Sequence, residues 1–175
     1  MVDQQGRTLD LEFVGGLITG EGSFCLSVNN LKNGKTVIRP AFYMQMDDIE
    51  TIELVASILK SAGQPPYVHR RQHKSRPGIE FGTVQYNGFK RVSRLISTVY
   101  PHLYGTKKRA AKLVQEFIYS RTQQPPNYPY TERELEIVAE LRATNGNRNG
   151  KKNPVATANP RPIVTLRGHT LGRSA

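Results

Sequence analysis

The sequence predicts an α+β fold whose elements follow the order α-ββ-α-ββ-α-α-α. Two pairs of short segments alternate apolar with polar residues, as the strands of β-hairpins do. Between and after these pairs, apolar residues recur every three or four positions, which is typical of helices. We therefore expect one antiparallel sheet with its apolar face against the helices and its polar face exposed.

The first half of the pattern contains one helix and one hairpin. The helix is expected over residues 9–20, with Asp10 as its N-cap. Strands at 23–29 and 36–46 follow, and an Asn-Gly pair at 33–34 marks the turn between them.

The second half begins with a helix and a second hairpin. The helix is expected over 48–62, with acids in its first turn and Gly63 as its stop. The two strands are expected at 67–72 and 79–86, joined by a polar turn at 73–78.

Three helices complete the predicted domain. An apolar stripe at 89–99 predicts the first, and a segment that opens at Thr106 and meets three prolines at 123–129 predicts the second. A capping box of Thr131 and Glu134 predicts the last helix, which ends near residue 142.

Charge limits the classes of partner. The chain has 25 basic and 14 acidic residues among 175, a formal charge of +11, which favours a polyanion and most often nucleic acid. No apolar run approaches the roughly 20 residues that span a bilayer, so a membrane partner is not expected. A single cysteine excludes an internal disulfide. The polar, acid-containing first ten residues resemble no secretory or transit peptide, so we expect an intracellular protein.

The composition changes after residue 144. Residues 145–175 are rich in Gly, Asn, Pro, Lys and Arg and contain no acid, so we expect a basic tail beyond a domain at 1–144. The tail is expected to be flexible unless DNA or a partner orders it, and 162–166 could form a short docked strand. The simpler interpretation is a tail that only adds non-specific affinity.

The segment VGGLITGEG at 14–22 is unusual for a helix. Each glycine within a helix costs about 1 kcal/mol relative to alanine, which helices packed in very close contact would offset. Glu21 ends this helix, where the helix dipole disfavours a carboxylate, and a divalent cation would remove the mismatch. Gly22 would form a left-handed C-cap. The alternative is a capped helix with a solvated glutamate.

Residues 13–24, FVGGLITGEGSF, resemble the signature of the LAGLIDADG homing endonucleases. The predicted elements are similar to the αββαββα core of that family, whose sheet forms a saddle on DNA, and the resemblance covers residues 9–143. Thr19 stands where the family commonly has an acid, but Glu21 occupies the position that the resemblance implies to be catalytic. We find one copy of the motif, which implies the homodimeric type.

The resemblance implies a metal-dependent nuclease. Two copies of Glu21 would meet at the dyad and, with the Gly20 carbonyl, hold two or three shared Mg²⁺ ions, for which Mn²⁺ or Ca²⁺ could substitute in binding. Each subunit would cut one strand of a long, near-palindromic duplex. The expected helix contacts across the dyad involve Val14, Gly15, Gly16, Ile18 and Thr19.

Alternation along the strands indicates a surface that could contact base edges. In the first hairpin it groups Ser23, Cys25, Ser27, Asn29, Arg39, Tyr43 and Gln45. In the second hairpin the resemblance places His69, Arg71 and Glu80 outward. Arg70 and Gln72 have the opposite parity in their strand, and an outward position for these two is the alternative. A solvated sheet face is the alternative.

Other candidate catalytic residues come from the resemblance. Lys107 or Lys108, near the start of a helix, would stabilise phosphoryl charge or orient water, with a plain basic patch as the alternative. Asp48 would organise water at the end of the second strand.

These patterns favour a site-specific, double-strand DNA endonuclease of intron homing, without a small-molecule substrate. It would act at DNA in a prokaryotic cytoplasm or nucleoid, or in an organelle. An intron RNA maturase or a non-cleaving DNA-binding protein on the same scaffold is the alternative. A ribosomal-type basic protein is a third possibility, and it predicts no dimer.

Overall fold

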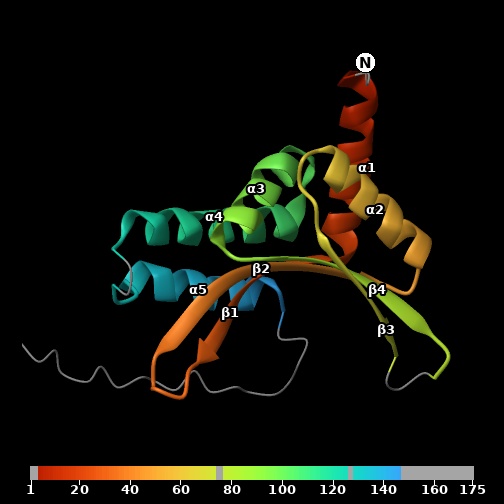
Figure 1. Ribbon diagram of the computed structural model, residues 1–175. Coiled ribbons are helices and arrows are strands. Elements are labelled where there is room, and N and C mark those ends of the chain that lie inside the picture. Colours follow the sequence, from red (N-terminus) through yellow and green to blue (C-terminus); the bar gives the residue numbers. More distant parts are fainter. Residues whose placement is uncertain (1–3, 74–76, 126–127, 147–175) are drawn as a thin grey trace, which may run out of the picture.

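The computed structural model describes residues 4–73, 77–125 and 128–146. Its elements follow the predicted order (Figure 1). They are α1 (Gln4–Glu21), β1 (Gly22–Asn30), β2 (Thr36–Met46), α2 (Ile49–Ser61), β3 (Tyr67–Gln72), β4 (Glu80–Asn87), α3 (Phe89–Val99), the 3-10 turn η1 (Tyr100–His102), α4 (Gly105–Gln123) and α5 (Glu132–Thr144).

The four strands form one antiparallel sheet in the order β1-β2-β4-β3. The sheet arches, and the β1–β2 turn points away from α1, α2, α3 and α4 (Figure 1). Phe24 of β1 lies opposite Phe42 of β2, and Tyr86 of β4 completes this row. All three side chains are buried, so this parity of each strand faces the helices and the other parity forms the outer face.

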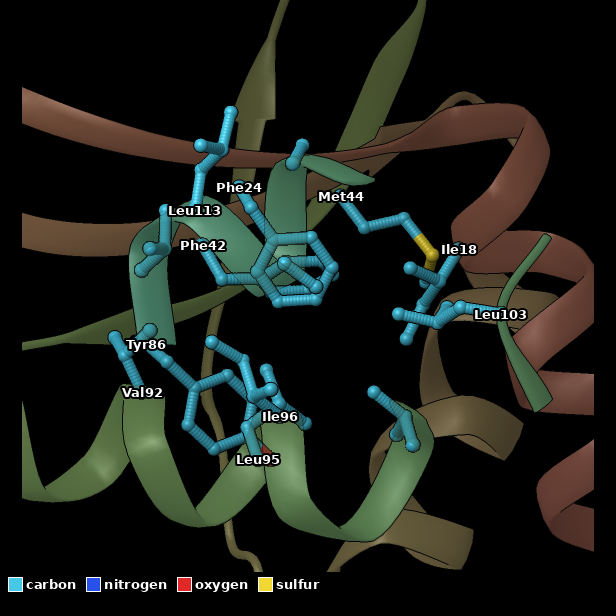
Figure 2. Packing of buried hydrophobic residues seen from close by; sticks show 14 of the residues in the cluster. Ile18, Phe24, Phe42, Met44, Tyr86, Val92, Leu95, Ile96, Leu103 and Leu113 are labelled. Atoms are coloured by element: carbon cyan, nitrogen blue, oxygen red, sulfur yellow. The ribbon is translucent and has the colours of Figure 1, made fainter. Parts of the chain in front are cut away.

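The core lies between the inner face of the sheet and the helices. Figure 2 shows Phe24 and Phe42 from the strands on the side of Leu95 and Ile96 of α3, while Met44 points toward Ile18 of α1. The rings of Phe24 and Phe42 lie 4.8 Å apart in a tilted pair. This packing fixes the phase of β1 and β2, because a shift by one residue would expose every large apolar side chain.

Two details of the first helix differ from the prediction. The helix begins at Gln4, so Asp10 lies within it and is not an N-cap. Gly22 begins β1 and lacks the positive φ of a left-handed cap, which the structure gives instead to glycines such as Gly63 (φ 77°). A Cβ on Gly22 would lie 2.7 Å from the Ile18 carbonyl oxygen, so close packing explains this glycine.

Helix α5 is attached to the domain through polar contacts at both ends. The predicted capping box is present: the Glu134 backbone N–H donates to the Thr131 hydroxyl oxygen, and the Thr131 backbone N–H donates to the Glu134 carboxylate. The buried Glu134 carboxylate also pairs with Arg121, at 3.3 Å. At the other end, Asn145 Nδ2 donates to the Phe24 carbonyl of β1, at 2.9 Å. The tail predicted beyond this point, including its possible strand, lies outside the described residues from 147 onward.

Candidate functional site

Glu21 stands where the first helix meets the sheet. It is the last residue of α1, its side chain is exposed, and the next residue begins β1. Gly22 lies opposite Met44, so the register places Glu21 beside the last residues of β2. The carboxylate therefore lies at the junction of a helix end and two strand ends, with Gly20 exposed next to it.

The start of α4 is held against the end of α1. The Thr19 hydroxyl donates to the Gly15 carbonyl at 2.8 Å and accepts from the Tyr104 backbone N–H at 3.4 Å. Tyr104 is the N-cap residue of α4. The positive end of the α4 dipole consequently lies beside the negative end of α1, which lessens the mismatch of an acid at that position.

The two candidate lysines lie on different sides of α4. Lys107 precedes the buried Ala110, Ala111 and Val114 by three, four and seven positions, so it lies on the side of α4 that faces the core. The Lys108 ammonium instead lies 5.0 Å from the centre of the Tyr100 ring.

Asp48 serves as the N-cap of α2. Its Oδ1 accepts from the Thr51 backbone N–H at 3.1 Å, and its Oδ2 accepts from the Thr51 hydroxyl at 2.7 Å. These bonds to Thr51 hold the pKa of the Asp48 carboxyl below its usual value. Both oxygens are thus engaged in the helix cap.

The outer face of the sheet carries polar residues from all four strands. Register pairs such as Ser27 with Arg39 and His69 with Thr83 lie there, on the opposite parity from the buried aromatic row. The candidates placed on this face are Ser23, Cys25, Ser27, Asn29, Arg39, Tyr43, Gln45, His69 and Arg71. Partial burial raises the pKa of the Cys25 thiol, and a hydrogen bond involving Ser27 opposes this shift.

The fold is that of a known group of DNA-cutting enzymes. No family model and no curated protein match the sequence. Among solved structures, the homing endonuclease I-CvuI has a TM-score of 0.60 at 13% identity, covering 81% of this chain and 85% of that chain. The LAGLIDADG homing endonuclease I-GzeII has a TM-score of 0.54 at 20% identity. The chain has the LAGLIDADG homing endonuclease fold.

The matched structures differ in length. I-SmaMI, another LAGLIDADG homing endonuclease, has a TM-score of 0.54 at 17% identity. The match covers 75–77% of this chain but only 42% of the I-GzeII and I-SmaMI chains. This chain therefore corresponds to less than half the length of those two proteins.

The packing of α1 within its own chain contradicts part of the predicted dimer contact. Val14 and Ile18 are fully buried in the chain's own core. Gly15 is buried as well, because a Cβ there would lie 2.5 Å from both Cβ and the carbonyl oxygen of His102 in η1. The close backbone approach that the glycines predicted is present at Gly15, but the segment that approaches it is η1 of the same chain. The prediction that these three residues contact a second subunit is wrong.

An uncovered face remains on the LAGLIDADG helix. Leu9 is 62% exposed and Phe13 is 44% exposed, and both lie at helical spacing with Gly16 and Gly20. A Cβ at either glycine would meet nothing within 4 Å. Thr19, at the border of this face, is half-buried and directs its hydroxyl to the Gly15 carbonyl.

The strand register of the second hairpin contradicts the outer-face position of three other candidate residues. Arg70, Gln72 and Glu80 lie on the parity that faces the helices, so they are not on the outer face. The Arg70 guanidinium forms an ion pair with Glu53 of α2. Gln72 Nε2 donates to Glu80 Oε1 at 2.9 Å.

Two outer-face residues were missed by the sequence analysis. Thr83 lies opposite His69, and Gln85 lies opposite Tyr43, both on the polar face of β4. The signal was present, because Val84 and Tyr86 alternate with them and are buried.

No group of three or more His, Cys, Asp or Glu side chains gathers as a metal site within 4–73, 77–125 and 128–146. Within those same ranges, no helix has the length and apolar character needed to cross a bilayer.

Proposed function

We propose that the protein is a homodimeric, site-specific DNA endonuclease that hydrolyses phosphodiester bonds with divalent metal ions. The observation that carries this proposal is the position of Glu21, an exposed acid where the uncovered face of α1 meets the outer face of the sheet. I-CvuI and I-GzeII, which share the fold, were solved in complex with DNA targets, and I-SmaMI was solved bound to cleaved DNA.

The uncovered face of α1 is suited to a second copy of the same helix. Gly16 and Gly20 are four residues apart, and this spacing lets two helix backbones approach closely. Leu9 and Phe13 would then bury their apolar surface between the two chains. A two-fold axis at this contact brings the two Glu21 carboxylates toward each other.

The donors available at such an axis suit Mg²⁺. The Glu21 carboxylates and the Gly20 carbonyls offer hard oxygen ligands, and scissile phosphates would supply more. Bound ions of this kind activate water and stabilise the leaving oxygen. Glu21 would hold the ions, and their charge would offset the repulsion between the paired acids. I-CvuI structures were determined in the presence of Ca or Mg.

Lys107 is the preferred basic residue for this site. It lies on the side of α4 that faces the core, near the helix start that is bonded to α1, and its ammonium would stabilise phosphoryl charge. Lys108 is engaged with Tyr100 on another side of α4, so we do not assign it this role.

The outer face of the sheet would contact the DNA grooves. Arg39 and Arg71 have the geometry to bond guanine, and Gln45 and Gln85 have the amide that pairs with adenine. A strand of nine residues spans about 30 Å, or roughly nine base pairs. Two subunits would therefore cover a target of about 20 base pairs. We place this activity inside the cell.

The test is a cleavage selection. The full chain is incubated with Mg²⁺ and a pool of randomised duplexes of about 24 base pairs, and the cut ends are captured and sequenced. We expect a near-palindromic consensus, lost on chelation of the metal. Glu21→Gln should bind the selected duplex and leave it intact, because the amide keeps the shape but not the charge. Binding without cleavage by the unchanged protein would refute the nuclease and favour a DNA-binding protein.

A further inference from the structure

A groove lies on the side of α4 that is turned away from the core. Ala111, Val114 and Ile118 of α4 are buried, and Lys112, Gln115 and Tyr119, each one residue further along, lie on the adjacent side of the helix. With residues of α3 and η1 they line a groove of about 660 Å³. It shares no residue with Glu21 or with the outer face of the sheet.

The groove offers flat apolar surfaces. Tyr119 is 68% exposed although it borders the groove, and Tyr100 and Pro101 form the facing side. The Lys108 ammonium lies over the Tyr100 ring, 5.0 Å from its centre. Tyr119 is thus the exposed ring of the groove, and an exposed aromatic ring near basic side chains is a surface on which unpaired bases stack.

The charge around the groove is positive. Lys112 lines it, and the exposed Lys90 and Arg94 belong to α3, an element without acidic residues. Glu116 is the acid of the lining, and its carboxylate accepts from Arg133 Nε of α5 at 2.8 Å, a guanidinium that also pairs with Glu136 and Glu140. The groove therefore attracts a phosphate backbone.

A buried acceptor in the groove wall fits the same kind of ligand. Gln115 Nε2 donates to the Ser93 hydroxyl at 3.0 Å, while Gln115 Oε1 is buried and has no hydrogen-bond donor among the described residues. A turn of the Gln115 amide toward the groove would offer this oxygen to an N–H group of an unpaired base, which a paired duplex keeps engaged.

We propose that this groove binds single-stranded nucleic acid, with a base stacked on Tyr119 and the backbone held by Lys112. The site works independently of the proposed nuclease site, because the two occupy different faces of the molecule. A strand in the groove leaves the outer face of the sheet free for duplex.

The test measures binding of a labelled 12-nucleotide strand to the full chain by fluorescence anisotropy, as oligo(U) RNA and as oligo(dT) DNA. Tyr119→Ala should weaken binding at least five-fold, which is the lower end for loss of one base–aromatic stack. Tyr128→Ala is the matched control, because Tyr128 is 50% exposed and lies outside the groove lining. Lys112→Glu should weaken binding and flatten its salt dependence.

The same variants separate this proposal from the proposed nuclease. Cleavage or binding of a 24-base-pair duplex should be unchanged in Tyr119→Ala, because Tyr119 lies far from the outer face in the fold. The proposal is overturned if neither strand binds or if the two tyrosine variants weaken binding equally. It is also overturned if unlabelled duplex displaces the strand, because the strand would then occupy the sheet.

Discussion

The two adjacent glycines of α1 should respond in opposite ways to the same substitution. In Gly15→Ala, the new Cβ would lie 2.5 Å from the carbonyl oxygen of His102, and that backbone atom belongs to the packed turn η1. Overpacking of this kind costs about 1–3 kcal/mol, and the better helix propensity of alanine returns roughly 0.5–1 kcal/mol. We expect a net destabilisation of about 1–2 kcal/mol.

Gly16→Ala is the matched control, one residue along the same helix. Its Cβ would meet nothing within 4 Å, so only the propensity gain applies and the subunit should become more stable by about 0.5–1 kcal/mol. The same methyl group would lie on the uncovered face of α1. If that face pairs with its copy, Gly16→Ala should weaken dimerisation and cleavage while leaving each subunit folded.

Thermal unfolding followed by circular dichroism measures the first effect, at a concentration where sedimentation shows monomers. For a chain of this size, 1 kcal/mol shifts Tm by about 2–4 °C, so Gly15→Ala should melt about 2–8 °C lower and Gly16→Ala a few degrees higher. A Gly15→Ala protein that melts at or above the wild type would refute the packing of α1 on η1. A Gly16→Ala dimer as tight as the wild type would refute helix pairing through this face.

Three further outcomes follow from the described contacts. Arg71→Ala should relax base preference by about 1–3 kcal/mol at one position of the selected target. Arg70→Ala should not, because Arg70 pairs with Glu53 of α2. Equal effects of the two substitutions would contradict the assigned faces of β3. Because burial raises the pKa of the Cys25 thiol above its usual value, its thiolate fraction at a given pH is below that of an ordinary cysteine. Iodoacetamide should therefore react slowly, faster as pH rises, and more slowly still with duplex bound. Unchanged rates with duplex would place Cys25 outside the contact. Leu9→Glu should sediment as a monomer where the wild type and Leu54→Glu remain dimers, since both leucines are exposed but only Leu9 is on the uncovered face.

The order of elements and most of their bounds could be predicted because burial contrast is strong in the first hairpin and in the helices. Strand β2 occupies the predicted residues 36–46, where Phe42 and Met44 alternate with Tyr43 and Gln45. The sequence left open which side of β3 faces the helices, because its two apolar residues, Tyr67 and Val68, lie on opposite faces and the four residues that follow are polar. The pairing of β3 with β4 determines which β3 residues face the helices, and the residues of β3 alone do not predict that pairing.

The site was predictable in part for a related reason. Glu21 stands out because its charge conflicts with the end of its helix, and this conflict is local in sequence. The partner of a glycine is not local, since Gly15 and Gly16 have the same propensity and differ only in what the fold places above them. Asp48 differs from the glycines, because its partner Thr51 lies only three residues along the chain and their hydrogen bonds assign Asp48 to a helix cap.

The hydroxyl of Thr19 has a consequence for how such an enzyme would be assembled. By bonding at once to the Gly15 carbonyl and the Tyr104 N–H, it joins the last turn of α1 to the first residues of α4. Glu21 and Lys107 therefore lie on segments that are already joined within one subunit, before a second subunit binds. In the proposed dimer, docking of two subunits would position both groups together, so a small error in docking would appear as slow turnover with unaltered sequence preference.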